Sequence, residues 1–151
     1  MTYLKIHPIV PIDMIKISKR FEYALLSIGY LHENTQENTM LGVRAVALEL
    51  QIPFDTLSKV FQILVHAKIL KPVHGAHGGH ILERPLKEIK FIELYRLFEE
   101  IPFGHKCNGP RDHCEIYSHC KIVTPMLQLH ERLFEFFSEL NVYDFLYPQK
   151  N

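Results

Sequence analysis

The fold is decided by residues 42–82, GVRAVALELQIPFDTLSKVFQILVHAKILKPVHGAHGGHIL. Apolar residues recur at helical spacing in two short runs, at about 42–50 and 55–65. The residue before Pro53 is pushed out of helical geometry, so a turn is predicted between the two runs. Asp55 is predicted to cap the second helix. Two short helices joined by a tight turn are typical of a helix-turn-helix.

A hairpin is predicted directly after these helices. Residues 69–73 and 80–82 are short apolar runs that favour strands, and they flank the glycine-rich stretch 75–79, GAHGG. Such a stretch suits a tight hairpin tip. Helix, turn, helix and two-stranded hairpin is the order of a winged helix. The predicted fold is therefore mainly α with a small two-stranded β wing.

Further helices are predicted on both sides of this unit. Pro8 and Pro11 favour an irregular arm over residues 1–13. A helix is predicted from Ser18, as its N-cap, to about His32. Another is predicted over residues 90–100. The side chains expected to point inward in these two helices are Phe21, Ala24, Leu25, Ile28, Phe91, Leu94, Tyr95 and Phe98.

The last helix is predicted to begin at Thr124 as N-cap, with Pro125 in the first helical position. Within it apolar residues step by three and four, as in a seam for another helix. These residues are Met126, Leu129, Leu133, Phe136 and Leu140, and Phe134 and Phe137 widen the apolar face. Packing on its own domain is one reading. A second copy is favoured, because the preceding helices have core faces of their own, and we expect a long C-terminal dimerisation helix.

Bulk composition restricts the class of protein. The 151 residues fit one domain, and 47% are hydrophobic, which is enough for a core. No apolar run reaches the roughly 20 residues of a membrane helix, and no secretory signal is evident, so a cytoplasmic protein without membrane association is expected. Neither a nucleotide loop, a zinc-protease motif nor a nucleophile elbow is present, so an enzyme is not expected.

The net charge is zero, but positive charge is concentrated in one stretch. Between Thr56 and Lys90 there are six Lys or Arg and only two acids, Glu83 and Glu88. Four histidines in the same stretch add hydrogen-bond donors. A locally basic stretch in a neutral chain is what one DNA-facing surface would give, although a solvated face gives the same pattern.

All three cysteines lie close together, at Cys107, Cys114 and Cys120. The surrounding segment, about 101–123, has no helical or strand period and is predicted to be a loop. Thiolates are soft ligands that suit iron–sulfur clusters or zinc. His105, His113 and His119 each precede a cysteine, so a zinc site of three Cys and one His is the rival reading. Against zinc, the short C-x₂₋₄-C spacing frequent in structural zinc sites is missing.

In this order, the motifs resemble the iron–sulfur-sensing regulators of bacteria, the IscR, NsrR and RirA group (the "Rrf-two" family). The resemblance covers about Met14 to Leu146. It rests on four features: KISKRFEYAL from Lys16, LSKVFQIL from Leu57, GAHGGHIL from Gly75, and the three cysteines between two helices. It implies a homodimer of winged-helix domains, bound to double-stranded operator DNA as a repressor or similar regulator. A [2Fe-2S] or [4Fe-4S] cluster would set the affinity for that DNA.

The chain departs from the family pattern at several positions. The usual spacing is five residues between each pair of cysteines, whereas six separate Cys107 from Cys114 here. The histidine ligand that the IscR subgroup carries after the last cysteine is replaced by Val123. The subgroup's base-reading glutamate corresponds to Ser58, and the arginine of its wing to His74. The resemblance therefore does not assign the family's operator sequence or cluster type to this chain.

The resemblance also implies a fourth cluster ligand. In the nitric-oxide and redox-sensing branches an acidic residue near the start of the first helix reaches the cluster from the opposite subunit, and that position falls on Glu22. An ordinary solvated carboxylate is the competing reading of Glu22. His105 is the runner-up ligand, because His113 and His119 directly adjoin cysteines, and adjacent side chains rarely converge on one metal.

DNA contacts are predicted at two places. The N-terminal end of the recognition helix should enter the major groove, with Thr56, Ser58 and Lys59 nearest the bases and phosphates. The wing should bring His74 and His77 to the flanking backbone or minor groove.

The expected divisions of the chain follow from these elements. They are an arm (1–13), a winged-helix DNA-binding domain (14–83), a connecting helix (84–104), a cysteine loop that binds the cluster (105–123), and a dimerisation helix with the C-terminal segment (124–147). The expected function is a DNA-binding transcription regulator that senses redox, nitric oxide or iron status. A zinc-stapled winged-helix protein without sensing, and a dimeric protein-interaction module, are the alternatives.

Overall fold

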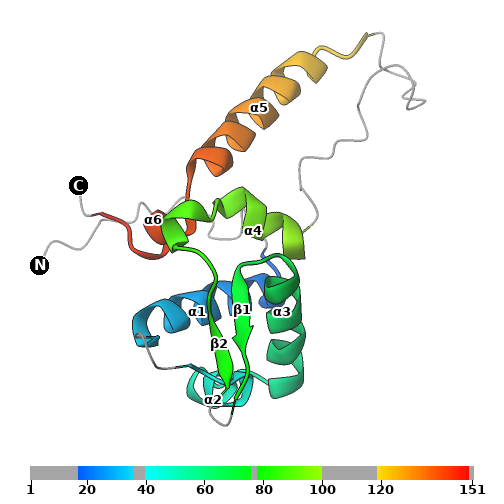
Figure 1. Ribbon diagram of the computed structural model, residues 1–151. Coiled ribbons are helices and arrows are strands. Elements are labelled where there is room, and N and C mark those ends of the chain that lie inside the picture. Colours follow the sequence, from blue (N-terminus) through cyan, green and yellow to red (C-terminus); the bar gives the residue numbers. More distant parts are fainter. Residues whose placement is uncertain (1–16, 36–39, 76–77, 100–118, 150–151) are drawn as a thin grey trace, which may run out of the picture.

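The computed structural model describes residues 17–35, 40–75, 78–99 and 119–149. The predicted arm and most of the predicted cysteine loop lie outside these residues. The elements in chain order are α1 (Lys19–Asn34), α2 (Val43–Glu49), α3 (Phe54–His66), β1 (Leu70–Val73), β2 (Gly79–Leu82), the 3₁₀ helix η2 (Leu86–Glu88), α4 (Phe91–Phe98), α5 (Val123–Glu139) and α6 (Val142–Leu146). Figure 1 shows the hairpin beside α1 and α3, α2 at the lower end, and α5 projecting away. The predicted fold class, mainly α with a small β wing and a long C-terminal helix, is confirmed.

Helix α1 forms where the sequence predicts it. The hydroxyl of Ser18 accepts a hydrogen bond from the backbone N–H of Phe21 at 3.2 Å, as an N-cap residue does. The residues that recur at helical spacing lie on the buried face: Phe21, Ala24, Leu25, Ile28 and Leu31. These side chains form the centre of the core, and α2, α3 and α4 pack around them.

The helix-turn-helix is confirmed, but the start of its second helix differs from the prediction. Helix α3 begins at Phe54, and the carbonyl oxygen of Pro53 accepts from the N–H groups of Thr56 and Leu57 at 3.1 and 3.0 Å. The prediction that Asp55 caps this helix is therefore wrong, because the helix has already begun at that residue. In the first turn the Asp55 carboxylate still interacts favourably with the helix dipole.

Strands β1 and β2 form the predicted antiparallel wing, with Leu70 paired to Leu82 and Val73 to Gly79. On its other edge β2 is bridged by Leu41, which precedes α2. The N–H of His80 donates to the Leu41 carbonyl oxygen at 2.9 Å. A Cβ atom at Gly79 would lie 2.7 Å from the Leu41 backbone, so only glycine permits this close approach.

The C-terminal segment returns to the winged-helix unit, which the sequence analysis did not predict. Phe91 N–H donates to the Leu140 carbonyl oxygen at 2.8 Å, and Val142 N–H donates to that of Ile89 at 2.9 Å. Asn141 caps α6 by accepting from Asp144 N–H at 2.8 Å. These bonds hold α6 against η2 and the start of α4.

Helix α5 begins two residues earlier than predicted. Its first residue is Val123, and no side chain caps it, so the assignment of Thr124 as N-cap is wrong. Pro125 fits the first turn all the same, because N–H groups there have no partner within the helix. None of the helices in the described ranges is long and apolar enough to cross a membrane.

Candidate DNA-binding surface and cysteine segment

The predicted reading residues all lie in the first two turns of α3. Lys59 is exposed, while Thr56 and Ser58 are half-buried. Their helix is held in place by Leu57, Val60, Phe61 and Leu64, which point into the core. The N-terminal end of α3 therefore presents hydroxyl and ammonium groups, which can contact bases and phosphates.

The two wing histidines differ in what the structure describes. His74 follows β1 directly and is exposed. His77 lies outside the described residues. The backbone of Gly75 has φ +138°, which an L side chain rarely adopts, so the glycine is needed to turn the chain at the tip.

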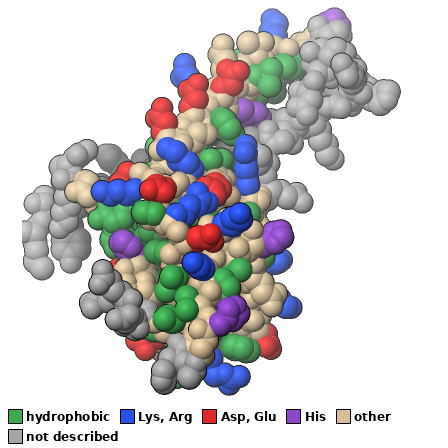
Figure 2. All heavy atoms as spheres, in the orientation of Figure 1, with side chains coloured by type: hydrophobic (Ala, Val, Ile, Leu, Met, Phe, Trp, Pro, Cys, Tyr) green, Lys and Arg blue, Asp and Glu red, His purple; other side chains and the backbone are tan. Residues whose placement is uncertain are grey.

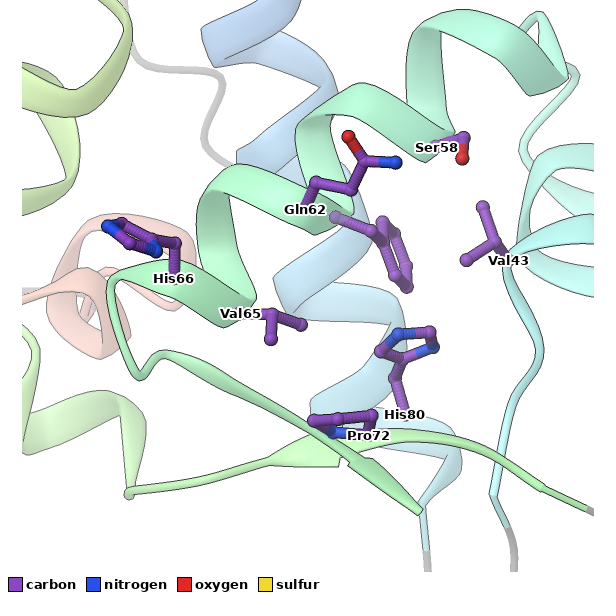
Figure 3. A pocket seen from close by; sticks show the side chains of 8 residues that line it. Val43, Ser58, Gln62, Val65, His66, Pro72 and His80 are labelled. Atoms are coloured by element: carbon purple, nitrogen blue, oxygen red, sulfur yellow. The ribbon is translucent and has the colours of Figure 1, made fainter. Parts of the chain in front are cut away.

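A hollow of about 420 Å³ lies between α3 and the hairpin, and we call it the α3–hairpin hollow (Figure 3). Three of its lining residues, Ser58, Gln62 and His66, are spaced four apart on one side of α3. The rest come from α2, the inner part of α3 and the hairpin: Val43, Phe61, Val65, Pro72 and His80. Apart from the histidines, no lining residue carries an ionisable side chain.

His80 is the unusual residue of this hollow. Its ring meets Phe61 edge-on, with the ring centroids 5.0 Å apart. Burial lowers the pKa of His80 below its usual range, against a smaller raising effect from the Leu41 carbonyl, so the ring is neutral at neutral pH. The buried Nδ1 atom has no hydrogen-bond partner among the described residues. In the sequence, His80 is one of the four histidines of the basic stretch and lies in a predicted strand, and neither feature indicates its packing against Phe61.

Arg44 is a second residue that the sequence analysis did not single out. Its guanidinium carbon lies 4.8 Å from the centroid of the Phe54 ring, a cation–π arrangement that joins α2 to the start of α3. The guanidinium is exposed beside the N-terminal end of α3. We add Arg44 to the candidate phosphate contacts. The signal available in the sequence was an arginine near the start of the predicted first helix of the helix-turn-helix.

The basic stretch predicted from the sequence does not form one continuous surface. Arg84 forms an ion pair with Glu93 of α4, and Lys87 lies over the ring of Tyr143 at 4.9 Å. In Figure 2, Lys and Arg side chains are interspersed with acidic ones around α4 and the adjoining part of the hairpin. The cations that remain for DNA are those on α2, α3 and the hairpin.

Only Cys120 of the three cysteines lies in the described part of the chain. It is half-buried and lies just before α5. Cys107 and Cys114 lie outside that part, as do His105 and His113, and His119 is exposed. Across residues 17–35, 40–75, 78–99 and 119–149, no three metal-ligating side chains gather in one place.

The start of α1 lies beside the end of α4, from which the cysteine segment departs. The backbone N–H of Ser18 donates to the Glu99 carboxylate at 2.7 Å. One turn further, Glu22 accepts from the Lys19 ammonium at 2.7 Å, and its side chain is 40% exposed. The candidate fourth ligand therefore lies one helix turn from a residue that contacts the end of α4 in the same chain.

Most of the apolar face of α5 is exposed, and only Phe137 is fully buried. Phe136, which the predicted seam includes, is 59% exposed, and Leu129 is 48% exposed. Met126 and Leu133 are half-buried, and Leu140 lies just after the helix ends.

Three comparisons with known proteins bear on this arrangement. Residues 17–148 match the model of the Rrf2 family, described as iron-dependent transcriptional regulators. No curated protein sequence is similar enough to count as a match. Among solved structures, T. potens IscR is similar with a TM-score of 0.64 and 19% identity, over 89% of this chain and 88% of that one. The global cysteine regulator CymR of B. subtilis is similar with a TM-score of 0.63 and 18% identity, over 91% of this chain and 100% of that one. The family match spans nearly the whole chain, which therefore belongs to the Rrf2 family of DNA-binding transcription regulators and is not an enzyme.

Proposed function

We propose that this regulator senses redox, nitric oxide or iron status through an iron–sulfur cluster held by Cys107, Cys114 and Cys120. The observation that carries the proposal is the placement of three thiols within 14 residues of sequence, between α4 and α5. The description of the family as iron-dependent and the likeness to IscR support it.

The donor set fits such a group. Three thiolates are soft ligands for iron, and a [2Fe-2S] or [4Fe-4S] cluster held by them leaves one position for a weaker ligand. A weakly held position makes a cluster easier to oxidise or dismantle, which a sensor needs. In this proposal the protein's own residues hold the cluster and pass its state to the DNA-binding surface through α4 and α1.

For the weaker ligand we propose Glu22 of the partner subunit, with His105 as the alternative. The resemblance to the nitric-oxide and redox-sensing branches supports Glu22, and its side chain is 40% exposed, so a group on another subunit can approach it. A carboxylate oxygen is a hard and exchangeable ligand, so it would keep the cluster labile.

We also propose that the protein acts as a homodimer through α5. On the side of this helix that carries the predicted seam, Leu129 and Phe136 lie two turns apart and are exposed to solvent. A second α5 packed along this face would remove that surface from water. Operator sites that are read by such a dimer have two related half-sites.

Two cluster-free readings compete with the cluster. The first is a zinc staple made by the same cysteines. The second is regulation without any metal; CymR, which is as similar to this chain as IscR, is described as a global regulator of cysteine.

Anaerobic purification tests the cluster directly. The proposal predicts a brown protein with visible absorption and comparable amounts of iron and acid-labile sulfide, lost in Cys120→Ala. A colourless protein with one zinc per chain supports the staple, and one without metal supports the CymR-like reading.

Separate reconstitution of Glu22→Ala and His105→Ala tests the fourth ligand, with Glu49→Ala, an exposed carboxylate on α2, as control. We expect Glu22→Ala alone to change the spectrum and to speed cluster loss in air. If only His105→Ala does so, the ligand is local to the cysteine segment.

A further inference from the structure

The α3–hairpin hollow combines a polar rim with an apolar floor, on the helix that carries the predicted base contacts. The rim is the row Ser58, Gln62 and His66 on α3, one residue per turn. The floor is formed by Val43, Phe61, Val65 and Pro72. Figure 3 shows the amide of Gln62 at the rim, on the same side of α3 as Ser58.

The hairpin forms one wall of the hollow through Pro72 and His80, which lie opposite each other in the β register. The backbone of His80 faces the other edge of β2, where it bonds to Leu41, so this pair has no ladder bond that would need an N–H from Pro72. The imidazole stands edge-on to Phe61, at the side of the recognition helix, and leaves the space beside it unfilled.

The chemistry of the lining favours one part of a DNA duplex over the others as the occupant. The residues that neutralise phosphate charge, Lys and Arg, do not line the hollow. Reading guanine uses Arg or Lys, and reading cytosine uses Asp or Glu, which are missing from the lining too. What the hollow does offer is an apolar floor and a polar rim, in which the Gln62 amide carries a donor and an acceptor side by side. An amide bonds both N6 and N7 of adenine, and apolar side chains contact the methyl group of thymine.

We propose that the α3–hairpin hollow reads an A·T base pair in the major groove. Gln62 donates to N7 of adenine and accepts from its N6 amino group. The thymine methyl of the same or the adjacent pair enters the apolar hollow. This assignment rests on the DNA-binding role of the family and extends base reading from the first two turns of α3 to its third.

The His80 ring forms part of the wall of the hollow, beside Phe61. Because burial lowers the pKa of His80, its ring is neutral at neutral pH, and a thymine methyl packed beside it removes no ionic group from water.

Selection from a duplex library with a randomised core tests the proposal, because the operator need not be known. Wild-type protein, Gln62→Ala and the matched control Gln128→Ala on the distant helix α5 are each used to select sites. The wild-type sites should contain an A·T pair whose preference is lost in Gln62→Ala alone. Affinity of Gln62→Ala for the wild-type site should fall roughly 5- to 150-fold, with the other positions unchanged.

Two further measurements test the methyl group. Thymidine is replaced by deoxyuridine at the selected A·T pair and, separately, at each adjacent pair, which removes only the methyl group. At one of these positions the replacement should lower the affinity of the wild-type protein severalfold. Val65→Thr, which keeps the shape of the side chain but makes the floor polar, should reduce this sensitivity. Thermal melts verify that both variants fold.

Three outcomes would overturn the proposal. If Gln62→Ala selects the same sites as the wild type, or loses preference at a G·C pair, Gln62 does not read adenine. If deoxyuridine binds as well as thymidine, the hollow does not hold the methyl. If the wild-type protein selects no sequence and binds no duplex, the chain does not bind DNA. That result would refute the DNA-binding role as well, whereas the first two outcomes would refute only the reading of A·T by the hollow.

Discussion

Phe21 is the side chain through which the winged-helix unit packs on α4, and its replacement by alanine should destabilise the whole protein. Phe21 is fully buried. Its ring meets Phe91 and Tyr95 of α4 edge-on, with centroids 5.6 and 5.4 Å apart, and Phe98 lies at 6.4 Å. These contacts join α1 to the helix from which the cysteine segment departs.

The size of the effect follows from the burial. Replacing a fully buried phenylalanine by alanine lowers the unfolding free energy by about 3–5 kcal/mol. This figure already includes the loss of the aromatic contacts. The total stability of a domain is about 5–15 kcal/mol, so the variant should lose a large part of it. For a chain of this length each kcal/mol lowers the melting temperature by about 2–4 °C, which gives a fall of roughly 6–20 °C.

Urea unfolding followed by circular dichroism measures this loss. Leu26→Ala is the matched control, because Leu26 lies on the same helix and is 47% exposed. All proteins are compared at one concentration, since dimerisation adds to the stability. A loss below about 1 kcal/mol for Phe21→Ala, or an equal loss for Leu26→Ala, would contradict the packing described for α1 and α4.

Four other changes have defined outcomes. Lys59→Ala should weaken DNA binding for every sequence and lower the slope of log affinity against log salt by about one, and an unchanged slope would remove Lys59 from the interface. His74→Ala combined with His77→Ala should lower DNA affinity with no change in melting temperature, whereas unchanged affinity would mean that the wing makes no contact. Leu133→Asp would put a carboxylate into the proposed α5 seam at a cost of several kcal/mol and should give monomers in sedimentation, so a persisting dimer would place the interface elsewhere. Burial and the hydrogen bond that Tyr147 donates to the Glu33 carboxylate raise the pKa of Tyr147 to about 12. Its contribution to stability is therefore full below pH ~10 and is lost as the pH rises toward 12. In Tyr147→Phe the loss of stability at alkaline pH should be smaller, and an unchanged dependence of stability on pH would contradict the assignment.

The winged-helix unit could be predicted from sequence because its signals are local and agree with one another. Helical spacing from Phe21 to Ile28, the break at Pro53 and the glycines at the hairpin tip each depend on a few neighbouring residues. The structure confirms all three.

The starts of two helices were misassigned for a shared reason. Asp55 and Thr124 are residue types that favour N-caps, but α3 and α5 begin upstream of them without any side-chain cap. Tertiary packing decides where a helix begins when its apolar face extends further than the capping signal.

Other features depend on contacts between distant residues and had no local signal. Helix α6 has only five residues, too few for periodicity to show, and it is held by bonds from Ile89 and Phe91 to residues about 50 positions away. The α3–hairpin hollow arises from the pairing of Pro72 with His80 and the bridge to Leu41. Side-chain identity at those positions gave no indication of a cavity.

The three cysteines were recognised from composition and spacing alone, since nothing in ordinary packing explains their clustering. Which group they bind depends on geometry that spacing does not encode. For the same reason Glu22 was reached only through a family resemblance, and the contact of Ser18 with Glu99 came from the fold.

The central claim is that the state of a cysteine-bound cluster controls DNA binding by this protein. It is tested most directly by titrating one selected duplex with the anaerobic cluster-loaded protein and with the same sample after the cluster has been removed. The account predicts affinities that differ by roughly 5- to 150-fold between the two forms, with Cys120→Ala fixed at the value of the cluster-free protein. Equal affinities for the loaded and cluster-free forms would contradict it.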